Sequence, residues 1–151
     1  MALKVGDTVP HFTAISLDGS AFDSKDLLGK KPIVLYFYPK DNTPGCTAQA
    51  CGFRDQYEEF KELGAEVIGV SADSPKSHQK FSKQYQLPFV LLSDTTNQLR
   101  KLFGVPNDLF GLLPGRATYV IDGEGKVQMI FDSVFGVAHI GKALNYLKKL
   151  C

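Results

Sequence analysis

Residues 33–38 form a continuous run of β-branched, aliphatic and aromatic side chains, and this run constrains the fold more than any other segment. Pro32 precedes it and Pro39 follows it. Short apolar runs of this kind are typical of a strand that is buried on both faces of a sheet. Residues 66–72 form a second such run. The chain is therefore expected to build its core around at least two buried strands.

Helical spacing fills the interval between these two runs. Within residues 45–63, Phe53, Tyr57 and Phe60 recur at i, i+4 and i+7 and would line one face of a helix. Gly64 is placed to end that helix, since glycine is common just beyond a helix C-terminus. We therefore predict one helix over residues 45–63.

Alternating strand and helix signals continue along the chain. Ser74 can cap a second helix with Pro75 in its first turn, and this helix ends before residues 87–88. Residues 89–92 predict a third buried strand, and residues 95–103 predict a third helix. The pattern is thus strand, helix, strand, helix, strand, helix.

Two hairpins and a last helix complete the expected order. Residues 12–17 and 21–22 predict an N-terminal edge hairpin, and residues 117–121 and 126–131 predict a second one. Residues 138–150 have the spacing of an amphipathic helix. This order predicts an α/β fold with a mixed central sheet flanked by helices, which fits a thioredoxin-like topology. Because no linker or repeat divides the chain, residues 1–151 are expected to form a single domain.

Charge and hydropathy exclude several classes of function. Lys and Arg total 17 and Asp and Glu total 16, so the net charge of +1 gives no reason to expect a nucleic acid or an anionic membrane as partner. No apolar run approaches the roughly 18 residues that a membrane span requires. The first ten residues lack the apolar region of a signal peptide.

The cysteines point to chemistry. The chain has Cys46, Cys51 and Cys151, an odd number that does not suggest a disulfide framework. Thr43 and Pro44 are suited to the N-cap and the first position of the helix, which would place Cys46 in its first turn. The free N–H groups and the dipole at that end favour an anion, so the sulfur is expected to react as a thiolate. A buried, purely structural cysteine at a helix start is the alternative.

The spacing of Cys46 and Cys51 limits what the pair can do. Four residues separate them, whereas thioredoxin-type exchange uses two. Five positions along an ideal helix separate two Cα atoms by roughly 8.6 Å, and a disulfide needs less than about 7 Å. A bond between them would therefore require the helix to unwind. A zinc site is the other interpretation, but His11, His78 and His139 are scattered singly and zinc normally takes four ligands.

The segment around these cysteines resembles the active-site segment of peroxiredoxins. The family pattern Pro-x-x-x-Thr-x-x-Cys matches Pro39, Thr43 and Cys46. Cys51 matches the resolving cysteine of the atypical two-cysteine class called peroxiredoxin Q, or bacterioferritin comigratory protein. The likeness extends over nearly the whole chain, through residues 5–7, 93–94, 109–111 and 113–120.

The resemblance implies a thiol-dependent peroxidase for hydrogen peroxide and organic hydroperoxides. Cys46 would be oxidised to a sulfenic acid, Cys51 would condense with it to a disulfide, and a thioredoxin or similar dithiol would reduce that disulfide. Arg116 matches the catalytic arginine of the family, Thr43 would hydrogen-bond the peroxide, and Pro39 would shield the thiolate from water. No metal, haem or nucleotide cofactor is implied.

Two other functions compete with the peroxidase. A general thiol–disulfide oxidoreductase is disfavoured by the four-residue spacing. A redox sensor that uses the same disulfide to change a surface stays open as a secondary role. The resemblance favours a monomer, because the resolving thiol lies in the same chain, and the compartment would be the cytoplasm in a bacterium or the chloroplast in a plant. Cys151 is expected to be an exposed thiol without a part in the mechanism.

Overall fold

The two apolar runs form neighbouring strands at the centre of the sheet. In the computed structural model, which describes residues 2–108, 113–133 and 135–150, they are β3 (Ile33–Phe37) and β4 (Glu66–Ser71). The two strands are parallel, with Ile33 opposite Glu66 and Phe37 opposite Val70. All five residues of β3 are buried. This arrangement is the one that a continuous apolar run predicts.

The sheet has seven strands in the order β2-β1-β5-β4-β3-β8-β9. Its parallel core, β3-β4-β5, is extended on both sides by antiparallel hairpins. The N-terminal hairpin therefore occupies one edge, as predicted, and the second hairpin occupies the other. The remaining strands are β1 (Thr13–Ser16), β2 (Ala21–Asp23), β5 (Val90–Ser93), β8 (Ala117–Ile121) and β9 (Val127–Asp132).

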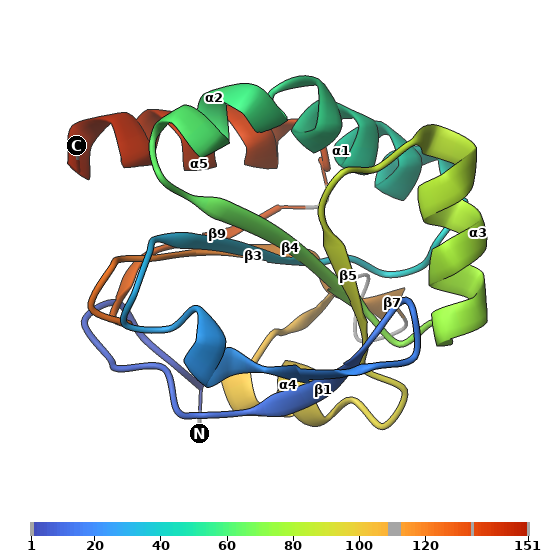
Figure 1. Cartoon of the computed structure of the whole chain (residues 1–151), viewed down its shortest axis with the longest axis horizontal. Coiled ribbons are helices and arrows are strands. Elements are labelled where there is room, and N and C mark those ends of the chain that lie inside the picture. The colour runs from blue at the N-terminus through green and yellow to red at the C-terminus, as the bar shows by residue number, and fades with distance from the viewer. Residues whose placement is uncertain (1, 109–112, 134, 151) are drawn as a thin grey trace.

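Helices cover both faces of this sheet (Figure 1). One core cluster packs beneath the helices α1 (Pro44–Asp55), α2 (Tyr57–Glu62), α3 (Pro75–Tyr85) and α5 (Ala138–Leu150). The other cluster lies on the opposite face, against α4 (Gln98–Phe103), the short 3₁₀ helix η1 (Ser24–Asp26) and the N-terminal segment. The predicted mixed sheet flanked by helices is confirmed.

The predicted single helix over residues 45–63 is wrong in one respect, because it is two helices. Gln56 leaves the helical conformation (φ −101°, ψ 6°) and separates α1 from α2. The apolar face continues across this break, and Phe53 and Phe60 are both buried. The break lets α1 pack on α5 while α2 packs on β4. Periodicity alone does not reveal a change of direction that tertiary packing imposes.

Other boundaries also moved. The third helix begins at Gln98 rather than Thr95, because the backbone N–H groups of Leu99 and Arg100 donate to the Asp94 carboxylate and fix the first turn there. A small two-stranded sheet, β6 (Asn107–Asp108) with β7 (Leu113–Pro114), was not predicted. The family-like motif at residues 109–111 and Cys151 lie outside the described residues.

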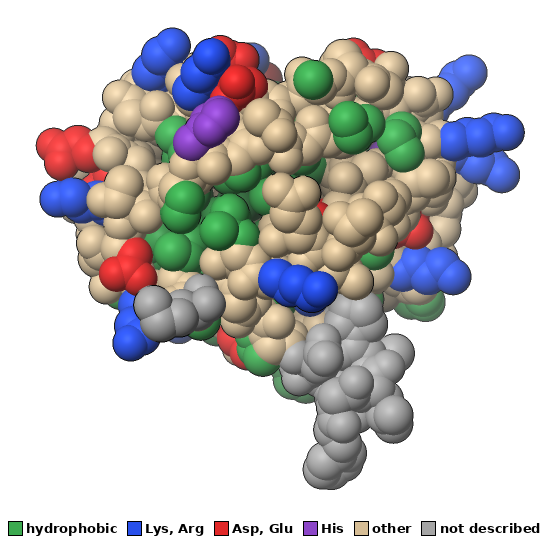
Figure 2. All heavy atoms as spheres, turned by 90° about the horizontal axis from the view of Figure 1, so that it is seen from below, with side chains coloured by type: hydrophobic (Ala, Val, Ile, Leu, Met, Phe, Trp, Pro, Cys, Tyr) green, Lys and Arg blue, Asp and Glu red, His purple; other side chains and the backbone are tan. Residues whose placement is uncertain are grey.

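The surface agrees with the balanced charge of the sequence. Figure 2 shows side chains of both signs around one face, with hydrophobic side chains gathered between them. None of the helices among the described residues is long and apolar enough to cross a membrane. That residues 1–151 form a single domain stays a prediction.

Candidate active site

Cys46 lies at the amino end of α1, beyond the carboxyl end of β3. The helix begins at Pro44, so Cys46 is in its first turn as predicted. The side chain is only 1% exposed. Orphan N–H groups and the helix dipole favour an anion at this position. The local sequence therefore delivers a buried sulfur to the positive end of a helix.

Arg116 meets this sulfur from another strand. The antiparallel pairing of β8 with β3 places Ala117 opposite Phe37, so the preceding Arg116 lies beside the segment that leads to α1. Its Nη2 donates to the Cys46 Sγ at 3.4 Å, and both side chains are buried. A guanidinium in this position stabilises a thiolate and still offers N–H donors to a bound oxygen. Two predicted site residues are thus brought together.

Gln49 is a site residue that the sequence reasoning missed. It lies one helical turn after Cys46, is fully buried, and its Oε1 accepts a hydrogen bond from Arg116 Nη1. The spacing i, i+3 from the cysteine was the available signal. Gln49 Nε2 and Arg116 Nε have no hydrogen-bond partner among the described residues. The site therefore holds buried N–H donors for which no described residue supplies an acceptor.

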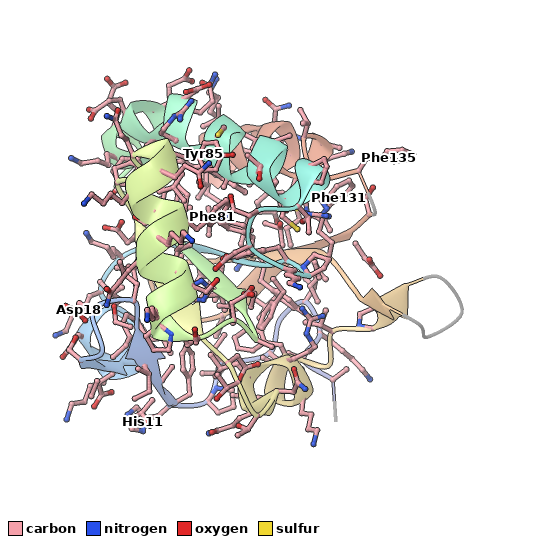
Figure 3. All side chains as sticks on the ribbon, turned by 90° about the vertical axis from the view of Figure 1, so that its right-hand side faces the viewer. His11, Asp18, Phe81, Tyr85, Phe131 and Phe135 are labelled. Carbon is pink, nitrogen blue, oxygen red and sulfur yellow. The ribbon has the colours of Figure 1, made fainter. Side chains whose placement is uncertain are left out.

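The segment before α5 closes over this site. A Cβ atom on Gly136 would lie 2.8 Å from the Gly45 carbonyl oxygen and 3.2 Å from Arg116 Nη1, so only glycine allows this approach. Its neighbours Phe135 and Val137 are 75% and 63% exposed. Figure 3 shows Phe135 projecting outward, whereas Phe81 points inward from α3. A backbone approach of this kind leaves no signal in sequence periodicity.

Cys51 is held in the same helix as Cys46. It is half-buried, and both cysteines are free thiols. Both lie within the intact α1, so the expectation that they cannot bond without unwinding applies to this structure. The adjacent Gly52 allows close packing of α1 on α5, because a Cβ there would lie 2.8 Å from Ile140 Cδ1. This packing is what local unwinding would disturb.

Thr43 occupies the predicted N-cap position, but its hydroxyl does not cap the helix. Thr43 Oγ1 instead donates to the Lys40 carbonyl at 2.9 Å. The hydroxyl therefore braces the loop and keeps its oxygen as an acceptor. Pro39 is half-buried, two residues after the end of β3. That Thr43 binds the peroxide and that Pro39 shields the sulfur stay predictions.

A second group of buried polar residues fixes the same loop. Asp41 accepts hydrogen bonds from Tyr38 Oη at 2.6 Å and from Ser77 Oγ at 2.9 Å. His78 Nδ1 lies 2.8 Å from Asp41 Oδ2, and its Nε2 donates to the Leu92 carbonyl at 3.0 Å. The pair ties the loop to α3.

This group also contains the one set of potential metal ligands among the described residues. Ligand atoms of Asp41, Asp73 and His78 lie within 4.8 Å of one another. Each acidic side chain already accepts hydrogen bonds, however, and Asp73 Oδ2 is engaged by the Asp41 N–H and by Ser71 Oγ. The arrangement is explained as a hydrogen-bonded brace for the loop.

Two buried tyrosines lie on the sheet side of the site. Tyr36 belongs to β3, and Tyr38 is the residue that follows this strand. Burial raises the pKa of Tyr36 well above its ordinary value, and the nearby Cys46 side chain adds to the rise. Tyr36 Oη has no hydrogen-bond partner among the described residues. Burial also raises the pKa of Tyr38 well above its ordinary value, with smaller contributions from Tyr36 and Asp41. Both phenols are therefore neutral in the folded protein.

Comparisons with known proteins agree on one family. The AhpC/TSA family matches residues 5–130. Peroxiredoxin Q from Populus jackii, a chloroplastic protein, is 53% identical over 146 residues, which cover 96% of this chain and 68% of the relative. The crystal structure of the peroxidoxin BcpB from Mycobacterium tuberculosis superposes with a TM-score of 0.90 at 39% identity over 99% of both chains.

A third similar protein is the bacterioferritin comigratory protein of Xanthomonas campestris, which has alkyl peroxide reduction activity. Its structure matches with a TM-score of 0.85 at 31% identity, over 98% of this chain and 97% of that one. These comparisons cover the fold and nearly the full length of the chain.

Proposed function

This chain belongs to the AhpC/TSA family and, within it, to the peroxiredoxin Q proteins, which are thiol peroxidases, and from that premise we propose that Cys46 is its peroxidatic cysteine. The observation that carries this assignment is the contact of Arg116 Nη2 with Cys46 Sγ at 3.4 Å, at the amino end of α1. Helix end and guanidinium both favour the thiolate, which is the nucleophilic form of the residue.

The first step is attack of the Cys46 thiolate on the terminal oxygen of the peroxide. A sulfur–oxygen bond forms while the oxygen–oxygen bond breaks, so the sulfur is oxidised to a sulfenic acid and the leaving oxygen takes up a proton as water or an alcohol. Charge develops on both oxygens as that bond breaks. In this proposal the Arg116 guanidinium stabilises this charge, and Thr43 orients the hydroxyl end of the peroxide.

The second step joins Cys46 to Cys51. The Cys51 sulfur attacks the sulfenic sulfur, a disulfide forms, and the oxygen leaves as water. Because both residues lie in the intact α1, the first turns of this helix must unwind before the sulfurs can meet. Oxidation and local unfolding of α1 are therefore coupled. While α1 is folded, Pro39 shields the Cys46 thiolate from water in this proposal.

The cycle closes by thiol–disulfide exchange. We propose thioredoxin or a similar dithiol protein as the reductant, because both electrons needed to reopen the disulfide then come from one partner. Hydrogen peroxide and alkyl hydroperoxides are the proposed substrates, the latter in keeping with the activity of the Xanthomonas campestris relative. We propose a monomer, since the resolving thiol lies in the same chain.

Peroxide turnover coupled to NADPH oxidation through thioredoxin reductase and thioredoxin tests this function. Wild type is expected to turn over continuously, and Cys46→Ser is expected to be inactive because the only proposed nucleophile is gone. Cys51→Ser should consume one equivalent of peroxide and form a sulfenic acid at residue 46, without thioredoxin-supported cycling.

Cys151→Ser is the matched control, because it removes the third thiol of the chain and should leave turnover unchanged. Continued turnover of Cys46→Ser, or an unmodified residue 46 after one equivalent of peroxide, would reject the assignment. Circular dichroism of the oxidised protein tests the unwinding. Equal helicity in the reduced form and in a verified Cys46–Cys51 disulfide would contradict it.

A further inference from the structure

Arg100 is a buried arginine that the proposed reaction does not use directly. It lies on α4, on the face of the sheet opposite to α1, and its side chain is 9% exposed. The guanidinium carbon lies 5.7 Å from the centre of the Phe37 ring. Its backbone N–H donates to Asp94, which fixes the first turn of α4. These contacts fix both the backbone and the side chain of this buried cation, so we ask which groups its guanidinium binds.

The guanidinium bridges two backbone carbonyls at the point where strands β3 and β8 separate. Regular pairing between these strands ends with Phe37 opposite Ala117. Beyond this pair, Arg100 Nη1 donates to the Gly115 carbonyl at 2.8 Å and Nη2 donates to the Tyr38 carbonyl at 3.4 Å. A side chain thus supplies hydrogen-bond donors at the open end of the ladder.

One bridged peptide adjoins Arg116, and the other opens the loop that leads to Cys46. The Gly115 carbonyl and the Arg116 N–H belong to one planar peptide unit, so fixing the carbonyl also fixes the backbone of Arg116. The Tyr38 carbonyl belongs to the peptide before Pro39, where the chain leaves β3 for the Cys46 loop. The Arg100 guanidinium therefore contacts both the backbone next to Arg116 and the start of the loop that carries Cys46.

We propose that Arg100 is a positioning residue for peroxide reduction, which sets the placement of the Arg116 guanidinium relative to the Cys46 sulfur. The proposal rests on the proposed role of Arg116. Arginine suits the task because its planar fork presents N–H donors in two fixed directions, whereas lysine offers a single point of charge. A small displacement of a charge-stabilising group is enough to slow a reaction considerably.

The test is a double-mutant cycle on the rate of the first chemical step. The second-order rate constant for oxidation of residue 46 by hydrogen peroxide is measured by rapid quenching and mass spectrometry, so thioredoxin is not involved. Arg100→Met is expected to lower this constant about tenfold in the wild-type background, and less than about twofold when Arg116→Met is already present. Residues that act through one another show this loss of additivity.

Arg54→Met is the matched control. Arg54 is also a helical arginine that donates to a backbone carbonyl, that of Tyr85, at 2.8 Å. Its removal should leave the rate constant unchanged. Arg100→Lys keeps a buried cation near Phe37 but cannot span both carbonyls, so it should remain at least about threefold slower than wild type. This variant serves if the methionine substitution prevents folding.

The outcomes separate the two hypotheses. An equal loss for Arg100→Met in both backgrounds would show a general structural role and overturn the positioning proposal alone. Full activity in Arg100→Lys would do the same. If Arg116→Met by itself left the rate constant unchanged, the proposed role of Arg116 would fail, and the inference would fail with it.

Discussion

Two groups of buried polar side chains hold the segment between β3 and α1, and they differ in how completely their atoms are paired. Around Asp41 and His78, both carboxylate oxygens and both ring nitrogens have partners. Around Cys46, the Arg116 Nε and the Gln49 Nε2 have none among the described residues. A buried donor without a partner lowers stability, since it has lost water and gained nothing in return.

The difference indicates that the group around Asp41 and His78 stabilises the loop, whereas the group around Cys46 serves the reaction. The paired group holds the loop in one conformation. The unpaired group leaves N–H donors on Arg116, which contacts the Cys46 sulfur, and on Gln49, which contacts Arg116, and we propose that a bound peroxide accepts hydrogen bonds from them. Active sites commonly retain such local costs to stability, and the surrounding fold compensates for them.

The largest expected effect is on stability, in the paired group. His78→Leu should lower the free energy of unfolding by about 3 kcal/mol, because it removes the ring nitrogen that pairs with the buried Asp41 carboxyl group. Urea denaturation followed by circular dichroism measures this change. Oxidation of Cys46 by hydrogen peroxide should slow by less than about threefold, since Arg116 and the Arg100 bridge between the Gly115 and Tyr38 carbonyls are both kept.

His11→Leu provides the matched control for that prediction. His11 also pairs with an aspartate, Asp23, at 2.6 Å, but its side chain is 59% exposed, whereas that of His78 is 0% exposed. Exposed ion pairs contribute little, so its denaturation midpoint should not move. If both substitutions shifted the midpoint equally, burial and pairing would not explain the role of His78.

The next effect is on rate, in the unpaired group. Arg116→Met should lower the rate constant for oxidation of Cys46 by about 100-fold, comparable to the loss of a donor from an oxyanion hole. Its free energy of unfolding should change by less than about 1 kcal/mol, because an incompletely paired buried cation is removed. A large loss of stability with an unchanged rate would reverse the comparison.

Two tyrosines on the same segment give a sharper and smaller contrast. Tyr38→Phe removes the hydrogen bond to Asp41 and should lower the free energy of unfolding by about 2 kcal/mol. Tyr36→Phe removes a buried hydroxyl without a partner among the described residues, so stability should stay the same or rise. Thermal unfolding of the two variants side by side measures the difference. Equal destabilisation would show that the Tyr36 hydroxyl has a partner after all.

The smallest effect concerns alkaline pH. Burial raises the pKa of Tyr119 from 10.0 to about 12, with a further contribution from Asp132. The folded protein therefore keeps a proton that the unfolded chain loses above pH 10, so this contribution to stability is present below pH 10 and is lost as pH rises towards 12. Tyr36 and Tyr38 act in the same direction.

Absorbance at 295 nm and circular dichroism, recorded together during an alkaline titration, test this expectation. Ionisation of the buried phenols should accompany the loss of helix signal. Reversible ionisation of all tyrosines near pH 10 with an unchanged helix signal would contradict the burial that the structure describes.

Local pattern was enough to predict most elements of the fold. The apolar run of β3, the Ser74 cap of α3 with Ser77 N–H donating to Ser74 Oγ, and both hairpins follow from residues that are near one another in sequence. Position in the helix also fixed Cys46 at the amino end of α1 and kept Cys51 apart from it. These properties depend on periodicity and turn chemistry, which neighbouring residues determine.

Only the tertiary structure decided the partners of the sulfur. Arg116 is 70 positions from Cys46, and without the family resemblance nothing in its own neighbourhood distinguishes it from a surface arginine. Gly136, Arg100 and the pairing of Gln49 with Arg116 were identified only when β8, α4 and the segment before α5 were placed against β3 and α1. Contacts of this kind depend on strand order and register, which are properties of the whole sheet, so no local stretch of sequence contains them.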